Sequence, residues 1–302
     1  MSGPRFVSMT WRPDQGMRML QAVADLPGLG ETELLTDEAF GIRGCLQPDG
    51  TIDTRVLGRD RRLPANWRGK RPDAERCAMH GLALDATFDV PEQSTYRVVA
   101  TLDAGNFGGH WLSRAAIRVE AVMRPSAIDI AVDVRNAGDD LLPVGIGWHP
   151  YFRIPSGRRE QARVHLPARQ RALVNNYDDV FPTGAFAPVR GTLYDFASPD
   201  GATLGSQYFD DCFVDLVKTP DGETRIDVCD HASGYHMRLT ALSPQVHAVQ
   251  MYAPPEKPFV VLEPQFNLAD PFGGEWPSGV DTGMTTVSPG DEVRWAVRWS
   301  LV

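Results

Sequence analysis

Three segments of the chain alternate apolar and polar residues with a strict period of two. In residues 293–301 every odd position is Val, Trp or Leu, while the even positions are Arg, Ala or Ser. Residues 117–123 and 128–134 repeat the pattern, with Pro125-Ser126 between them. Successive side chains of a strand point to opposite faces, so this period predicts strands with one buried and one solvated face. The short turn predicts that the latter two strands are antiparallel neighbours.

Helical patterns are scarce elsewhere in the chain. Residues 17–24 fit a short amphipathic helix, and no later segment sustains a period of 3.6 residues. Glycines (28) and prolines (24) are spread along the chain as turn residues, with no linker between domains. We therefore expect an all-β fold, a large antiparallel β-sandwich in a single domain over 1–302, whose residues 1–30 either pack on it or form an N-terminal extension. Further strands are expected at 95–102, 163–166, 224–228, 235–241, 248–252 and 259–262.

The charge balance and the cysteines exclude several classes of protein. The 302 residues carry 30 Lys and Arg against 39 Asp and Glu, and without a basic cluster we expect no nucleic-acid partner. The longest uncharged stretch, 239–255, contains three prolines, so no membrane span is expected. The N-terminal segment lacks the apolar stretch of a signal peptide, which predicts a cytoplasmic protein. The four cysteines are far apart and form no CxxC pair, so we expect neither a zinc site nor a disulfide framework.

Three ionisable residues lie within apolar or glycine-rich segments. His80 interrupts CAMHGLAL, where a hydrogen-bonded core histidine is the favoured interpretation from the residues alone. His149 lies in GIGWHPYF, which fits either a proton donor beside sugar-binding aromatic rings or an aromatic cluster that caps the sandwich. Glu263 ends the apolar strand FVVLE, and a buried carboxylate must be either an ion-pair member or a functional base. We favour function for Glu263, with His149 as its acid partner.

These segments, in this order, give the chain a resemblance to the aldose 1-epimerases, or mutarotases, of the galactose mutarotase-like family. The matching motifs are CAMHG with His80, GIGWHPYF with His149, YFDDCF with Asp210, VQMYAPP with Gln250, and VVLEPQF with Glu263. The likeness extends from about residue 30 to the end of the chain, and HPYF is its most specific part.

The resemblance implies a β-sandwich that binds a sugar in an open cleft, with no metal and no organic cofactor. By position, Glu263 would be the catalytic base that removes the proton of the anomeric hydroxyl, and His149 the catalytic acid that protonates the ring oxygen. His80, Asp210 and Gln250 would bind the sugar hydroxyls. The implied reaction opens and recloses a free aldose, which interconverts its α and β anomers. The expected partner is a small sugar, and the protein is expected to be a monomer or a homodimer.

The chain departs from the family pattern in two places. Relatives carry a sugar-binding arginine upstream of the first histidine, and Arg68, Arg71 and Arg76 are equal candidates for it here. Many relatives also have an arginine after the His-Gly pair, where this chain has Leu-Ala-Leu, and its loss argues against a phosphorylated substrate. A hexose-6-phosphate 1-epimerase remains an alternative, as does a non-catalytic sugar-binding or sensing protein, although such a protein needs no acid and base. A phosphate pocket could use Arg59, Arg61, Arg62, Arg68, Lys70 and Arg71.

Overall fold

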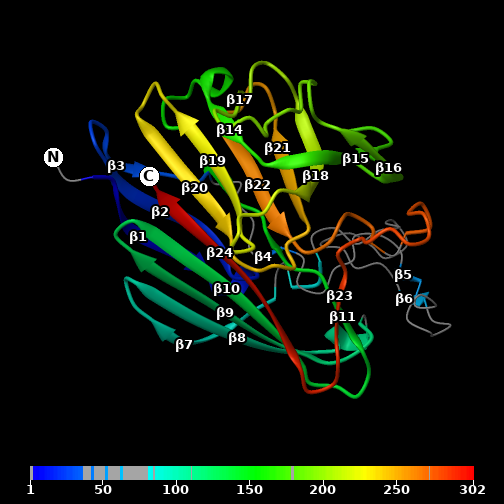
Figure 1. Cartoon of the computed structure of the whole chain (residues 1–302). Helices are drawn as coiled ribbons and strands as arrows, with labels where there is room; N and C mark the ends of the chain where they lie inside the picture. The colour runs from blue at the N-terminus through cyan, green and yellow to red at the C-terminus, as the bar shows by residue number, and fades with distance from the viewer. Residues whose placement is uncertain are drawn as a thin grey trace.

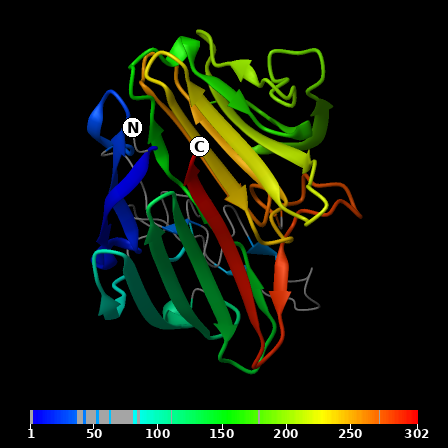
Figure 2. The same ribbon diagram turned by 60° about the vertical axis from the view of Figure 1, so that its left-hand side comes forward.

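The computed structural model describes residues 3–36, 81–83, 86–109, 111–177, 180–271 and 273–302, together with the backbone of 42–43, 52–53 and 62–63. Within these residues the chain is built from β-strands, and its helical turns are 3-10 segments of three residues. They are η1 (Pro13–Gln15), η3 (Phe107–Gly109) and η4 (Arg159–Gln161). The all-β antiparallel sandwich predicted from the sequence is therefore confirmed (Figures 1 and 2).

The first large sheet of the described residues has nine strands. It contains the three segments with the strict period of two, and two of them form the predicted antiparallel hairpin, in which Ile130 pairs with Ala121. Its strand order is β17 (Ala202–Thr203), β14 (Arg163–His165), β19 (Thr224–Asp230), β20 (Tyr235–Ala241), β24 (Glu292–Leu301), β10 (Ala127–Asn136), β9 (Ala115–Arg124), β8 (Arg97–Gly105) and β7 (Asp89–Gln93).

The second large sheet faces the first and contains the strands of Asp210, Gln250 and Glu263 and the strand that precedes His149 (Figure 1). Its order is β16 (Pro182–Pro188), β15 (Ala168–Val174), β18 (Phe209–Leu216), β21 (Ala248–Ala253), β22 (Phe259–Gln265), β12 (Gly147–Trp148) and β4 (Ile42–Arg43), and β13 (Tyr151–Arg153) also pairs with β22. Two smaller pairs join β11 (Leu142–Val144) to β23 (Thr285–Val287) and β5 (Ile52–Asp53) to β6 (Arg62–Leu63).

The core lies between the two large sheets, where their alternating apolar side chains meet. Trp295 and Trp299 of β24 are fully buried, and the Trp299 ring lies 5.0 Å from that of Phe152 and 6.2 Å from that of Trp148. Aromatic pairs at these separations add to the stability that burial of apolar area provides. The sandwich therefore fixes β12 and β13, which flank His149, against the centre of the opposite sheet.

The N-terminal residues form a three-stranded sheet of β1 (Arg5–Arg12), β2 (Arg18–Leu26) and β3 (Gly30–Glu33). The helix expected at 17–24 is therefore wrong. Its apolar residues also fit a strand, and pairing with both neighbours buries Met19, Ala22 and Ala24 completely. The Phe6 ring lies 5.1 Å from that of Trp299, so this sheet packs on the sandwich (Figure 2).

Candidate active site

His149 and Glu263 lie side by side on the outer face of the second sheet. His149 directly follows β12, and Glu263 lies in β22, the strand that pairs with β12. His149 Nε2 is 3.4 Å from Glu263 Oε1, and the two side chains are 7% and 1% exposed. A buried carboxylate is costly unless a partner is close, and the imidazole is such a partner.

Local sequence features explain how these two side chains meet. A Cβ atom at Gly147 would lie only 3.0 Å from the Cβ of Gln265, so glycine permits the close approach of β12 to β22. The ring of Tyr151 stacks on the imidazole of His149, with 5.0 Å between centroids and an interplanar angle of 7°. This stacking restricts the rotation of the imidazole and directs it toward Glu263.

A polar row continues from Glu263 across the next two strands. Gln250 of β21 is the direct cross-strand partner of Glu263, which brings the two side chains onto the same face. Gln250 Nε2 donates a hydrogen bond of 2.6 Å to Oδ1 of Asp210 in β18. The row therefore presents an imidazole, a carboxylate, an amide and a second carboxylate along one line of the sheet.

Two small apolar clusters flank this row on the same face. One contains Tyr151, Phe259 and Val261, with Tyr252 packed against it. The other is built from Cys212 and its neighbours on β15, β18 and β21, and includes Trp276. A polar row between apolar flanks matches sugar recognition, in which hydroxyls need hydrogen-bond partners and C–H faces need apolar contact.

The structure brings together four of the five site residues predicted from the sequence: His149, Glu263, Asp210 and Gln250. The fifth, His80, lies outside the described residues, as do Arg68, Arg71 and Arg76. His149 and Glu263, which the sequence predicts as an acid and a base, are close enough to contact one substrate.

Sequence reasoning missed the network beneath Asp210. Asp211 is fully buried and accepts hydrogen bonds from Arg171 Nη1 at 2.7 Å and from the Tyr177 hydroxyl at 3.1 Å. Burial raises the pKa of Asp211, although Arg171 opposes this. Burial and a hydrogen bond with Tyr194 both raise the pKa of Tyr177. The adjacent Asp210 and Asp211 in YFDDCF were the available signal for this network. Successive side chains of a strand point to opposite faces, so one of the two carboxylates must point inward.

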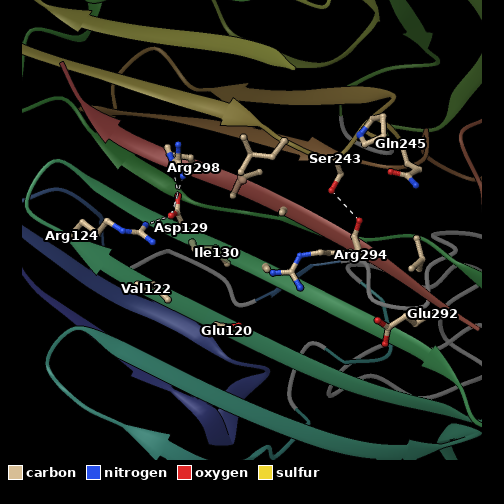
Figure 3. Close-up of a pocket in the computed structure, with 16 residues that line it drawn as sticks. Glu120, Val122, Arg124, Asp129, Ile130, Ser243, Gln245, Glu292, Arg294 and Arg298 are labelled. Carbon is tan, nitrogen blue, oxygen red and sulfur yellow. Dashed lines mark hydrogen bonds and ion pairs between the residues drawn. The ribbon is translucent and has the colours of Figure 1, made fainter. Parts of the chain in front are cut away.

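A groove of about 700 Å³ lies elsewhere, on the outer face of the nine-stranded sheet over β10 and β24 (Figure 3). Most of its charged side chains form ion pairs within the groove or with neighbouring residues of the sheet. Asp129 accepts a hydrogen bond from Arg298 at 2.6 Å and also bonds Arg124. None of the predicted site residues lines this groove. The arrangement is typical of a solvated, ion-paired sheet face.

Among the residues whose positions the structure describes, no three His, Cys, Asp or Glu side chains are grouped so that they could hold a metal ion. In the same part of the chain, no helix is long and apolar enough to cross a membrane.

Comparison with known proteins identifies the family. The family model for aldose 1-epimerase matches residues 50–299, so the chain belongs to the aldose 1-epimerase family. Membership supports an epimerase function in general, namely an isomerase that acts on carbohydrates, and implies a small sugar as the substrate. No match was found among the curated proteins.

Solved structures share the fold over nearly the whole chain. A galactose mutarotase-like protein from Clostridium acetobutylicum superposes with a TM-score of 0.78 at 15% identity, covering 99% of this chain and 94% of that chain. The GalM/aldose epimerase homologue from C. elegans gives 0.77 at 17% identity, covering 100% and 99%. A galactose mutarotase-like protein from Lactobacillus casei gives 0.73 at 16% identity, covering 99% and 97%. At these identities the comparisons establish the galactose mutarotase-like fold.

Proposed function

We propose that this protein is an aldose 1-epimerase that interconverts the α and β anomers of a free aldose. The observation that carries the proposal is the 3.4 Å separation between His149 Nε2 and Glu263 Oε1 on a buried part of the sheet. In a pyranose, the hydroxyl oxygen O1 and the ring oxygen O5 are both bonded to C1. An acid and a base this close can therefore reach both oxygens of one sugar together.

The reaction needs two proton transfers and no covalent intermediate. The Glu263 carboxylate takes the proton from O1 as the C1–O5 bond breaks, while protonated His149 gives its proton to O5. The open-chain aldehyde then rotates about the C1–C2 bond. Ring closure on the other face of the carbonyl reverses both transfers, which returns a proton to His149 and leaves Glu263 as a carboxylate.

Asp210 and Gln250 have the role of hydroxyl binding in this proposal. Their hydrogen bond orients both groups, and each keeps further hydrogen-bonding capacity for a substrate. Gln250 is next to Glu263 in the register of β21 and β22, so a sugar over the acid–base pair extends toward Asp210. The same role for His80 rests on the resemblance of CAMHG to the family motif.

Anomer exchange measured by NMR tests this function. Purified protein is mixed with glucose, galactose and their 6-phosphates, and the exchange rate between α and β signals is compared with buffer alone. Faster exchange of a free aldose is the expected result. Exchange that requires the 6-phosphate would instead identify a hexose-6-phosphate 1-epimerase. Sugar signals that broaden on binding without faster exchange would identify a sugar-binding protein without turnover.

A further inference from the structure

Asp211 is a buried carboxylate directly behind Asp210, and the proposed chemistry does not use it. Its two oxygens accept hydrogen bonds from three groups. Arg171 Nη1 donates at 2.7 Å, the Tyr177 hydroxyl at 3.1 Å and the backbone N–H of Asp210 at 3.2 Å. A buried ion pair of this kind adds little stability compared with apolar side chains that fill the same space. The position of the carboxylate beneath the site therefore calls for a role other than stability.

The backbone N–H of Asp210 lies where β18 loses a neighbouring strand. The register of β15 with β18 ends where Ala172 faces Cys212, before it reaches Asp210. Oδ2 of Asp211 takes the place of a strand carbonyl as the acceptor for this N–H, which fixes the orientation of the backbone. On the opposite face, Gln250 donates to Oδ1 of Asp210. Asp210 is therefore held through its backbone from one face of the sheet and through its carboxylate on the other.

Tyr177 joins the connection between β15 and β16, at the edge of the second sheet, to the start of β18 (Figure 1). A carboxylate only accepts hydrogen bonds, so the Tyr177 hydroxyl donates to Asp211 and its oxygen accepts from the Tyr194 hydroxyl at 3.2 Å. The Tyr177 ring lies 5.2 Å from that of Tyr208, the residue two before Asp210. Tyr177 therefore restrains both the Asp211 side chain and the segment that leads into Asp210.

Arg171 stabilises the ionised form of the Asp211 carboxylate. Burial raises the pKa of Asp211, and the positive charge of Arg171 opposes that rise. The guanidinium is fixed in turn, because its central carbon lies 3.8 Å from the centre of the Tyr194 ring. An ionised carboxylate can accept from all three donors at once, whereas a protonated one gives up an acceptor position. The network thus favours a single orientation of the Asp211 side chain.

We propose that Asp211 and Tyr177 are positioning residues for the reaction, which act through Asp210 and contact no substrate atom. The inference rests on the proposed epimerase function of the same site, in which Asp210 binds a sugar hydroxyl. A carboxylate that is held in its binding orientation before the substrate arrives loses little conformational entropy on binding. The network therefore lowers KM and leaves the proton transfers between Glu263, His149 and the sugar unchanged.

Tyr177→Phe tests this role, because it removes the hydroxyl and keeps the ring that contacts Tyr208. Saturation curves of anomer exchange are measured by NMR for the free aldose that the wild type accelerates most. The variant should raise KM by about threefold to tenfold, the size of one lost hydrogen bond, and keep kcat within about twofold of the wild type.

A second background separates positioning from a general effect on the fold. The Asp210→Ala protein lacks the group to be positioned, so adding Tyr177→Phe should leave its kcat/KM unchanged. As a matched control, Tyr96→Phe removes the hydroxyl of a tyrosine that is 64% exposed between β7 and β8, and should keep the wild-type KM. Thermal unfolding checks that each variant is folded.

Three results would overturn the positioning role. They are an unchanged KM in Tyr177→Phe, a fall in kcat at constant KM, and an equal fall of kcat/KM in the wild-type and Asp210→Ala backgrounds. The last result would mean that the Tyr177 hydroxyl acts on the fold and not through Asp210. Wild-type protein that accelerates no aldose would overturn the proposed function, and the positioning role with it.

Discussion

Nε2 of His149 and Oε1 of Glu263 are 3.4 Å apart, although 114 residues separate them in the chain. This is longer than an ordinary N–H···O hydrogen bond, so the two groups are close without a short bond between these two atoms. The pairing of β12 with β22 creates the proximity, and the stacked ring of Tyr151 preserves it.

His149→Asn should lower kcat by about two to four orders of magnitude, because the variant lacks the group that protonates O5. His149 is nearly buried, but asparagine is also polar and is somewhat smaller, so the variant should keep the fold. Anomer exchange with a free aldose gives the rate, and circular dichroism gives the fold. A loss smaller than about tenfold would mean that another group donates the proton.

Asp210→Ala should lower kcat/KM by about 10- to 100-fold, which is the range for loss of a hydrogen bond to a charged group. Asp210 contacts hydroxyls and no reacting atom in the proposed mechanism, so KM should change more than kcat. Saturation curves for the free aldose give kcat and KM separately. A fall in kcat at constant KM would assign Asp210 to the chemical step.

Arg171→Leu should destabilise the protein by about 3–5 kcal/mol, because it leaves the buried Asp211 carboxylate without its cation. The double variant Arg171→Leu/Asp211→Leu removes both charges and should recover much of this loss. Urea unfolding of the two variants and the wild type gives the comparison. If the single variant were as stable as the wild type, the ion pair would have no structural role.

Asp227 should contribute stability that depends on pH. Burial opposes its ionisation, but hydrogen bonds from His165, His236 and Arg238 outweigh burial and lower its pKa from 3.8 to about 2. A lowered carboxyl pKa stabilises the folded state above the unfolded pKa, and this stability is lost as the pH falls through the folded value. Asp227→Asn should therefore cost about 2 kcal/mol at pH 7.

The cost of Asp227→Asn should shrink by about half at pH 3, where the unfolded wild type is already protonated. Urea unfolding of both proteins at pH 7, 4 and 3 measures the difference. A cost that stays constant or grows with acidification would contradict the lowered pKa.

Much of the sandwich could be predicted from the sequence, because period two is a local property of each strand. The strands around Ile130 and Trp295 were predicted correctly, because one face of each is apolar and the other carries the charged residues. The prediction of a helix at 17–24 was wrong, because a short apolar segment fits a helix and a strand equally well. Only the pairing with β1 and β3 decides between the two.

The candidate site was predictable where a motif singled out one residue, as for His149 and Glu263. The support beneath it was not, since it depends on contacts between distant segments. Arg159 reaches the carbonyls of Gln207 and Ala253, and Arg171 reaches Asp211. Likewise, no sequence motif indicates that His165 and His236 both lie within 4 Å of Asp227 across neighbouring strands.

The most direct measurement compares anomer exchange of glucose and galactose in wild-type protein, Glu263→Gln and Glu292→Gln. Glu292 is an exposed carboxylate in the groove of the opposite sheet, so its substitution controls for the loss of a charge (Figure 3). The proposed mechanism predicts that Glu263→Gln loses catalysis yet still binds sugar, while Glu292→Gln exchanges anomers as fast as the wild type. Near-normal exchange by a folded Glu263→Gln protein would contradict the assignment of Glu263 as the base.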